Sequence, residues 1–575
     1  MSEGVAERDT AGGATNGAKE SQAGVASQAT QGRAQSAGIQ SRGATQTGPT
    51  RSPMGVMGVE TEYAVSDLDD PHANPIQLSH DVIAAASQSE DEAAVRWDYC
   101  LEDPINDARG MHLQRAQADP SMLTDSPQLQ ATNRVQRNGS RIYVDHAHPE
   151  YSAPECVGPF ESLAYGRAGD VLMREAARRA SQATGRRIVL HRNNADGKGA
   201  SWGAHENYHV PRATPFQRLA DLFTVHAVTR QIYTGSGRVG LGEHSETPGF
   251  QLSQRADYFH ARIGLQTTFD RPIVNTRDES HSTDEFRRFH VIAGDANRMD
   301  VPEVLKLGTT AMVLWLAQVL PDAGFEPDAT VASLMPADPV RAMQAVSHDL
   351  TLREPLDMAD GGRLTAWQIQ LKLRGLVYAA ASQIWGCTSL GEPLWPDDDT
   401  RRIMDMWGDA LQDVGHVMQA SDDDRLGLDQ SARVEWLLKW QILESLRRRK
   451  SSDWTDMRLR AADIAWAALE PRGCVFEAVK SRTDRVADDE AIAEAVARPP
   501  ADTRAWLRGT LVAGRPGAVR SAGWGRIVLQ DSDGAPYVVD CSDPRSHTQD
   551  ADAAAVRAFL DDGDVAAFVA ALSQR

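Results

Sequence analysis

The order of the predicted elements constrains this fold most, because strands dominate the first half of the chain and helices the second. Strand-like stretches rich in Val, Ile, Tyr and Phe are predicted at residues 140–145, 187–192, 202–210, 249–258, 272–276 and 286–293. Helical periodicity is predicted over residues 160–183, 215–232, 304–319, 364–382, 401–418, 432–447 and 456–467. The two types do not alternate regularly, as they would in a doubly wound parallel sheet, so we predict an α+β fold.

The first 53 residues differ in composition from the rest of the chain. They contain no aromatic side chain, and their large aliphatic residues are Val5, Val25 and Ile39. Such a segment buries too little apolar surface to offset the entropy of ordering it. We therefore predict a disordered tail over residues 1–53, with a docking tail as the alternative. A main domain is expected over residues 54–487, and a small domain of short helices around a strand pair over residues 488–575.

The segment of residues 101–138 is polar, punctuated by proline and without periodicity. Uncommitted loops of this length are usually functional or disordered. We predict a mobile loop that covers a site, with plain disorder as the alternative.

Charge and cysteine usage exclude several classes of protein. The chain has 60 Lys and Arg against 80 Asp and Glu, a net charge of −20, so a general nucleic-acid binder is not expected. No apolar run approaches the roughly 18 residues of a membrane span, and no signal-peptide stretch is present. Five scattered cysteines without CxxC spacing argue against a disulfide scaffold and a zinc cluster. A cytoplasmic protein with reduced thiols is predicted.

Glu60 and Glu62 form an ExE pair on a predicted strand. Residues two apart on a strand share a face, so both carboxylates project together. Adjacent carboxylates repel one another unless a cation lies between them, and oxygen ligands suit Mg²⁺. The alternative is a solvated strand face.

Other predicted strands also carry polar residues on one face. Arg141, Tyr143 and Asp145 alternate with apolar residues, and the run DHAHPE at 145–150 concentrates possible ligands and bases. A surface turn is the alternative there. The same spacing joins His205 to Asn207 and Arg288 to His290. A sheet lined with Glu, His and Arg suits a metal and a nucleotide, because cations and Arg neutralise phosphates and carboxylates hold the cations.

Several long strings resemble the depupylase branch of the family of ligases and depupylases of Pup, the prokaryotic ubiquitin-like protein. They are GVETEY, RIYVDHAHPEYSAPEC, NNADGKGASWGAHENY, TGSGRVG, PGFQLSQRADY, NTRDE, HVIAGDAN, LKLGTTA and PPADTRAWLRG. DHAHPE and the DGKG of residues 196–199 are of the depupylase type rather than the ligase type. The resemblance implies a glutamine synthetase-like fold, a curved and mainly antiparallel sheet packed with helices, with residues 54–487 as the catalytic domain.

The resemblance also implies the residues of the site. Asp145 would be catalytic, and Glu62 would support the metal site. The implied Mg²⁺ ligands are Glu60, Tyr143, Glu150, His205 and His290. The implied contacts to ATP are Arg141, Ser152, Ala153, Asn207, Arg288 and Trp436, with Arg141 directed at a phosphate or at a carboxylate of Pup.

The implied reactions are hydrolysis of the side-chain amide of the C-terminal Gln of Pup to Glu, and cleavage of the isopeptide bond between Pup and lysines of other proteins. ATP and Mg²⁺ would be bound cofactors. The alternatives are a Pup–protein ligase, a non-enzymatic Pup-binding regulator and a γ-glutamyl–amine ligase for small molecules. The implied partners are Pup and pupylated proteins of the bacterial proteasome pathway. Because Pup is acidic, a basic patch is expected, for which one candidate set is Arg212, Arg218, Arg230 and Arg238.

Overall fold

The computed structural model describes residues 51–573, except 88, 119–122, 124–131, 245, 268, 269 and 280. The predicted tail over residues 1–53 therefore lies almost entirely outside the described residues. Among the helices that are described, none combines the length and hydropathy that a membrane span requires.

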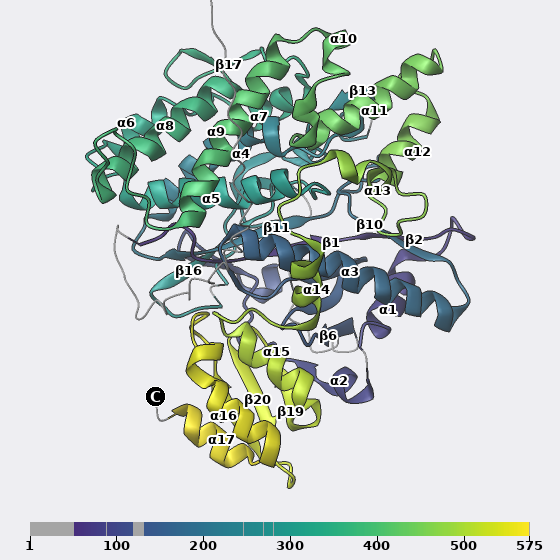
Figure 1. The fold of residues 1–575 in the computed structure, drawn as a ribbon, viewed down its shortest axis with the longest axis vertical. Helices are drawn as coiled ribbons and strands as arrows, with labels where there is room; N and C mark the ends of the chain where they lie inside the picture. The colour runs from purple at the N-terminus through teal and green to yellow at the C-terminus, as the bar shows by residue number, and fades with distance from the viewer. Residues whose placement is uncertain are drawn as a thin grey trace, which may run out of the picture. The chain divides into compact units, whose positions relative to one another are not determined.

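A seven-stranded sheet forms the centre of the fold (Figure 1). Its strands run in the order β16-β11-β1-β8-β7-β6, and β9 also pairs with β1. Every pair in it is antiparallel. The strands are β1 (Val56–Glu62), β6 (Asn133–Val135), β7 (Arg141–Asp145), β8 (His148–Ser152), β9 (Cys156–Val157), β11 (Ala204–Pro211) and β16 (Phe286–Val291).

Alternation along these strands separates an apolar face from a polar face. Val59, Ile142, Tyr151 and Tyr208 are buried on the apolar face. Helix α3 (Pro159–Thr184) packs closely against this face. A Cβ atom at Gly169 would lie 2.3 Å from the Tyr151 ring, so the close approach requires glycine there. The opposite face of the sheet is left for polar side chains.

Helices α4 (Phe216–Thr234) and α5 (Asp300–Val319) pack against each other behind the sheet and continue the main core. The other helices up to residue 497 are α1 (Pro75–Ala84), α2 (Glu90–Ala94), α6 (Pro327–Ala332), α7 (Pro339–His348), α8 (Ala366–Trp385), α9 (Asp398–Gln419), α10 (Asp422–Arg425), α11 (Glu435–Arg449), α12 (Met457–Trp466), α13 (Val475–Val479) and α14 (Asp489–Ala497). Short 3-10 helices are η1 (Arg115–Gln117), η4 (Ala256–Tyr258), η5 (Asp429–Ala432), η6 (Lys480–Arg482) and η7 (Pro516–Ala518).

The remaining strands form small sheets. They are β2 (Ala64–Asp67) with β10 (Ile188–His191), β4 (Asn106–Asp107) with β5 (Met111–His112), β12 (Arg238–Leu241) with β13 (Thr247–Gln251), β14 (Ala261–Gly264) with β15 (Pro272–Asn275), and β17 (Pro355–Asp357) with β18 (Arg363–Thr365). The fold class, α+β with a mainly antiparallel central sheet, is as predicted. The strand expected over residues 249–258 is wrong beyond Gln251, because the backbone N–H groups of Ser253 and Gln254 turn to the side chains of Ser347 and Asp295.

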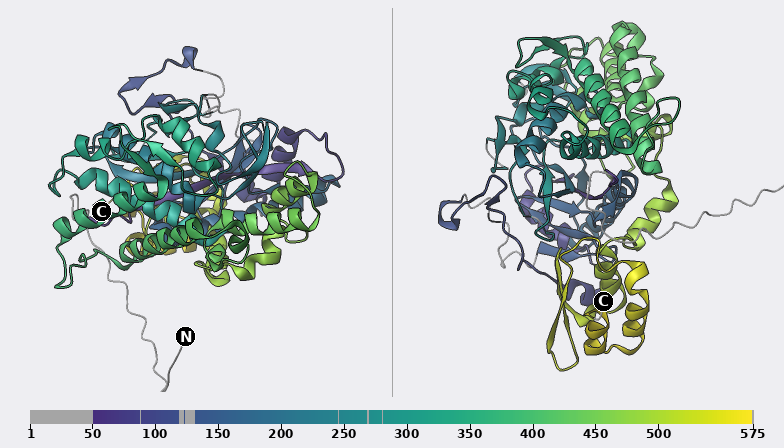
Figure 2. Two further views of the ribbon diagram at one scale, coloured as in Figure 1. Left: turned by 90° about the horizontal axis from the view of Figure 1, so that it is seen from above. Right: turned by 90° about the vertical axis from the view of Figure 1, so that its left-hand side faces the viewer.

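The C-terminal segment has a core of its own. Helices α15 (Ala505–Gly514), α16 (Gln549–Asp562) and α17 (Val565–Ser573) pack with β19 (Val519–Ala522), β20 (Arg526–Gln530) and β21 (Pro536–Asp540), as the right view of Figure 2 shows. Strand β3 (Arg96–Trp97) adds to this sheet in parallel with β19. Helix α14 instead packs on α3, and its Ala495 belongs to the main core. The division at residue 488 stays a prediction, and the second core itself is built from α15 onward.

The described parts of the segment 101–138 are built into the fold. The N–H of Ala108 donates to the carbonyl of Thr276 at 2.8 Å, and the N–H of Asp278 donates to that of Asn106 at 2.9 Å. Strand β6 closes one edge of the central sheet. Residues 119–122 and 124–131, on which the prediction of a mobile loop also depends, lie outside the described residues.

Candidate active site on the polar face of the sheet

Side chains from neighbouring strands meet on the polar face because the strand register places them opposite one another. Glu60 lies opposite both His205 and Ser152, and Glu62 lies opposite Glu150. Together they line a cavity of about 420 Å³. The expected residues in its lining are Glu60, Glu62, Arg141, Tyr143, Asp145, Glu150, Ser152, His205, Arg288 and His290.

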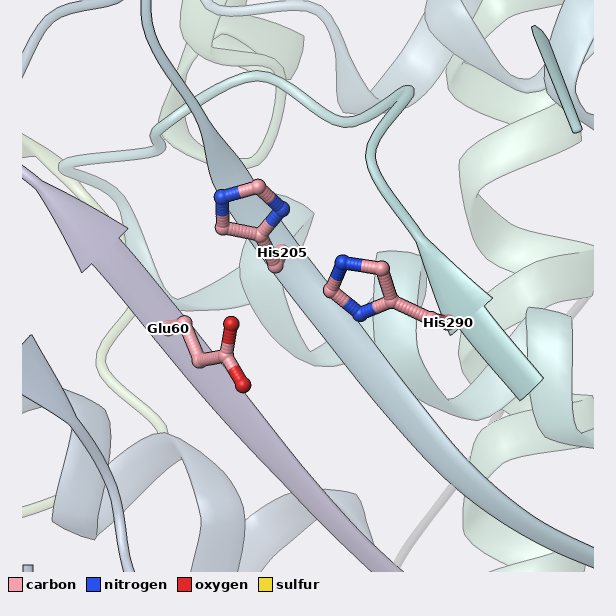
Figure 3. A group of neighbouring side chains, drawn as sticks. All are labelled: Glu60, His205 and His290. Carbon is pink, nitrogen blue, oxygen red and sulfur yellow. The ribbon is translucent and has the colours of Figure 1, made fainter. Parts of the chain in front are cut away.

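Glu60, His205 and His290 form one possible metal site (Figure 3). Each offers a ligand atom, and these atoms lie within 4.8 Å of one another. Burial lowers the pKa of His290 well below its usual value, so the imidazole is neutral and can act as a ligand. Its Nδ1 lies 2.8 Å from Oδ1 of Asn207, which orients the ring and leaves Nε2 for a metal.

Glu62, Asp145 and Glu150 form a second group, whose possible ligand atoms also lie within 4.8 Å of one another. Burial, together with the charges of Asp145, Glu62 and Glu60, raises the pKa of Glu150 well above its usual value. Its Oε1 is buried without a hydrogen-bond partner among the described residues. Burial alone would raise the pKa of Glu62, but a hydrogen bond to His205 and the charge of His148 lower it to about 2. Such a cluster of carboxylate oxygens fits a hard divalent cation such as Mg²⁺.

Tyr143 lies among these carboxylates, opposite Glu150 on the neighbouring strand. Burial, with the charges of Glu150 and Glu60, raises the pKa of its hydroxyl well above 10. The phenol is therefore protonated at neutral pH. Tyr143, which was expected to be a metal ligand, therefore offers a neutral hydroxyl oxygen beside these carboxylates.

Asp145 is the most accessible carboxylate of the second group. Its side chain is 21% exposed, against 11% for Glu62, and Glu150 is almost fully buried. It ends β7, where a two-residue turn leads to His148 on β8. His146 in this turn has φ +52°, a left-handed conformation that non-glycine residues rarely adopt, and its Nδ1 lies 2.9 Å from Oδ2 of Asp145. The tight hairpin therefore presents Asp145 to the cavity.

Arginines line the same cavity and give it an anion-binding side. The guanidinium of Arg141 lies between the rings of Trp97 and Tyr143, 4.2 Å and 3.9 Å from their centroids. Arg288 lies 3.1 Å from Glu279 and 3.6 Å from Glu60. These two arginines were expected. Sequence reasoning missed the others, Arg255, Arg271 and Arg277.

A smaller, mainly apolar cavity adjoins the first. Three of the expected nucleotide contacts, Asn207, Ala153 and Arg288, line it, and Arg288 and Glu60 are shared with the larger cavity. Trp524, from the C-terminal segment, also lines both cavities. An apolar pocket beside an arginine-lined one suits a ligand with a flat ring at one end and anionic groups at the other.

Trp436, an expected nucleotide contact, is not brought to this site. It lies on α11 in the main core, 1% exposed, and its indole N–H donates to the carbonyl of Ile232 at 2.9 Å. It is not among the residues that line either cavity. The position of Trp436 therefore does not support its prediction as a nucleotide contact, whereas Trp524 lines both cavities.

The basic patch considered for an acidic partner is also not formed. Arg230 is 2% exposed and pairs with the buried Glu206, and Arg238 is 4% exposed. Both guanidinium groups lie inside the protein, so they cannot form a surface with Arg212 and Arg218.

The chain is similar to several known proteins. The family model described as "Pup-ligase protein" matches residues 55–528. The chain is 41% identical to a protein of Acidothermus cellulolyticus named depupylase, over 82% of this chain and 90% of that one. It is 37% identical to a Mycobacterium tuberculosis protein named Pup deamidase/depupylase, with the same coverage. It is 34% identical to a Mycobacterium avium protein named Pup–protein ligase, over 72% of this chain and 87% of that one.

Two solved structures have a similar fold. The ligase PafA in complex with Pup matches with a TM-score of 0.69 and 25% identity, over 88% of this chain and 92% of that one. PafA in complex with ADP matches with a TM-score of 0.63 and 28% identity, over 75% and 89%.

Proposed function

Because the chain belongs to the Pup-ligase protein family, we propose that it is a Pup deamidase and depupylase. It hydrolyses the side-chain amide of the C-terminal Gln of Pup to Glu, and it cleaves the isopeptide bond between Pup and lysines of pupylated proteins. Its partners are thus Pup and the pupylated proteins of the proteasome pathway. The observation that carries the proposal is the partly exposed carboxylate of Asp145 at the end of β7, presented beside two buried carboxylates in the large cavity.

ATP or ADP is proposed to bind across the two cavities, with its base in the apolar one and its phosphates in the arginine-lined one. Trp524, Ala153 and Asn207 line the first, and Arg141, Ser152 and Arg288 line the second. The proposed Mg²⁺ ligands are Glu60, Tyr143, Glu150, His205 and His290, with Glu62 in support. Bound Mg²⁺ would offset the charge of phosphates and carboxylates. The ADP complex of PafA supports this proposal.

Asp145 has two possible roles in hydrolysis. In the first, its carboxylate attacks the amide carbonyl, the C–N bond breaks, ammonia or the lysine amine leaves, and water then opens the anhydride. In the second, it removes a proton from the attacking water. The hydrogen bond with His146 orients the carboxylate in both cases. Each route consumes one water and does not consume the nucleotide.

The ligase alternative requires net use of ATP to form the same bond. The DHAHPE and DGKG strings and the higher identity to depupylases favour hydrolysis. A regulator without activity would not need the crowded carboxylates, which are costly to bury. A cytoplasmic location is proposed too, in keeping with the five free cysteines, Cys100, Cys156, Cys387, Cys474 and Cys541.

The test follows the mass of Pup that ends in Gln during incubation with the purified chain, Mg²⁺ and ATP. We expect the amide to become an acid, with ADP and phosphate supporting the reaction in place of ATP. A parallel incubation contains Pup that ends in Glu, ATP and an acceptor protein. Conjugate formation there without amide hydrolysis would establish a ligase, and no change in either incubation would leave only a binding role.

A further inference from the structure

A third cavity, of about 400 Å³, is lined by residues of α3, α13, η6 and α14. Helix α14 crosses α3 in Figure 1, and the two helices pack against each other. Among the described residues, none lines both this cavity and either cavity of the candidate active site. Its volume is within the range of roughly 300–1,000 Å³ that is usual for small-molecule sites. It is therefore a separate candidate binding site.

Part of the lining of this third cavity is apolar. Leu469 and Phe476, each 3% exposed, line it together with Val171, Ile492 and Val496. The ring of Phe476 is packed in turn against another buried aromatic ring. Because removal of apolar surface from water is favourable, such a lining suits an aliphatic or aromatic group.

The charged part of the lining contains more cations than anions. The anions are Asp170, Asp300, Glu477 and Asp489, and the cations are Arg167, Arg174, Arg298, Lys480 and Arg485. The chain as a whole carries a net charge of −20, so a local excess of positive charge departs from its composition. The excess favours an anionic ligand.

The two most buried of these carboxylates are already paired. Asp300 accepts hydrogen bonds from Nε of Arg167 and Nε of Arg485, both at 3.0 Å. Asp170 accepts one from Nη1 of Arg192, also at 3.0 Å. Because each carboxylate is neutralised by its own arginine partners, neither opposes an anion that enters the cavity.

Two cations beside Glu477 have donors to spare. Nη2 of Arg298 donates to Oε1 of Glu477 at 3.2 Å. Nε of Arg298 is buried without a hydrogen-bond partner among the described residues, in a side chain that is 7% exposed. Lys480 lies three residues after Glu477, and no residue in the described part of the chain forms a hydrogen bond or ion pair with its ammonium group. Buried donors without an acceptor are costly, so the lining lacks an acceptor here.

We propose that the third cavity binds a small amphipathic anion, with an anionic head group and a short aliphatic body. The head group accepts hydrogen bonds from Lys480 and Arg298, and the aliphatic body lies against Phe476 and Ile492. The inference goes beyond the proposed function, because the site shares no described lining residue with the candidate active site.

The first test titrates the wild-type full chain with octanoate and follows binding by saturation-transfer NMR of the ligand. We expect saturable binding of octanoate. Octanamide keeps the aliphatic body without the charge, and inorganic phosphate keeps a charge without the body. Each should bind at least about tenfold more weakly, because the site requires both parts. Equal binding of octanamide or of phosphate would overturn the proposed ligand class, and no binding of octanoate would overturn the site.

The second test locates the head group with Lys480→Gln, which removes one charged donor. Octanoate should bind this variant about tenfold more weakly. The matched control is Lys372→Gln, which makes the same change of charge at an exposed position on α8, and its affinity should stay within about twofold of wild type. Equal weakening in both variants, or in neither, would contradict the assignment of Lys480.

The third test fills the cavity and leaves its charges unchanged. Ala493 lines the cavity from an exposed position on α14, so Ala493→Phe should fold, and its ring should occupy the space of the aliphatic body. Octanoate binding should be lost, while the melting temperature and the hydrolysis of Pup stay at their wild-type values. Octanoate binding that survives in Ala493→Phe would overturn the inference. Wild-type protein that binds octanoate but does not hydrolyse Pup would overturn the proposed function alone.

Discussion

Glu60 is proposed to bind a metal ion rather than to stabilise the core. It lies on the polar face, accepts a hydrogen bond from Nδ2 of Asn207 at 3.0 Å and adjoins two histidines. Glu60→Gln keeps the volume and removes the charge. Loss of an outer-shell partner costs about 10–100-fold in metal affinity, so loss of a ligand should cost at least about 100-fold.

This prediction is checked by titrating hydrolysis against Mg²⁺ and by thermal melting. The melting temperature should stay close to that of wild type, and the Mg²⁺ requirement should rise or activity should disappear. The control is Glu175→Gln, at an exposed carboxylate on α3, which should change neither. Unchanged Mg²⁺ dependence in Glu60→Gln would remove this residue from the site.

At the residue scale, site residues could be predicted from the sequence where side chains alternate between the two faces of a strand. Glu60, Asp145 and His290 were found because every second residue of a strand shares a face. Arg255 and Arg271 lie outside the strands of the sheet, so the same rule could not find them. Trp436 and Trp524 could not be told apart without knowing which of them the fold buries in the main core.

At the scale of elements, the parts of the segment 104–136 contribute differently to the stability of the fold. Ile105 is 1% exposed, and Val135 on β6 is 2% exposed in the second core. Burial of each such side chain contributes about 1.5–3 kcal/mol. Deleting residues 104–136 should therefore give insoluble or strongly destabilised protein. Replacing only residues 119–131 with a Gly/Ser linker should leave folding intact.

Soluble yield and melting temperature distinguish the two variants. Equal, wild-type stability of both would show that β6 and Ile105 are dispensable for folding, which would contradict the prediction. From the sequence the segment was predicted as one unit, because its polar and proline-rich composition gives no sign of the strand pair β4–β5 or of strand β6 within it. Its anchoring to residues 276–278 depends on contacts distant in sequence, which no local pattern encodes.

At the scale of the whole molecule, Glu155 joins the central sheet to the C-terminal segment. Its carboxylate accepts from Nε of Arg504 at 2.6 Å and from Nη2 of Arg508 at 2.5 Å. The guanidinium of Arg508 also lies 4.9 Å from the ring of Trp524. The segment was expected to be a separate small domain, but it supplies Trp524 to the site. Composition and periodicity indicate which residues of the segment form its own core. They do not indicate which of its residues contact the rest of the protein.

The pH dependence of stability tests this junction. Burial would raise the pKa of Glu155, but Arg508 and Arg504 lower it from 4.5 to about 2. The ionised carboxylate therefore stabilises the fold fully above about pH 5, and this contribution is lost as the pH falls towards 2. The shift corresponds to about 3 kcal/mol. In urea unfolding, Glu155→Gln should be less stable than wild type by about this amount at pH 7, and the gap should narrow at pH 3. A gap that does not change with pH would mean that the ion pair is not its source.

The most direct test of the proposed function is the rate of hydrolysis by Asp145→Asn, measured on Pup that ends in Gln and on a Pup conjugate. Asparagine keeps the shape of the side chain and can act neither as nucleophile nor as base. Both rates should fall together by several orders of magnitude, while ADP binding measured on the same preparation stays at its wild-type value. Substantial hydrolysis of either substrate by a variant that still binds ADP would contradict the assignment of Asp145 as the catalytic residue.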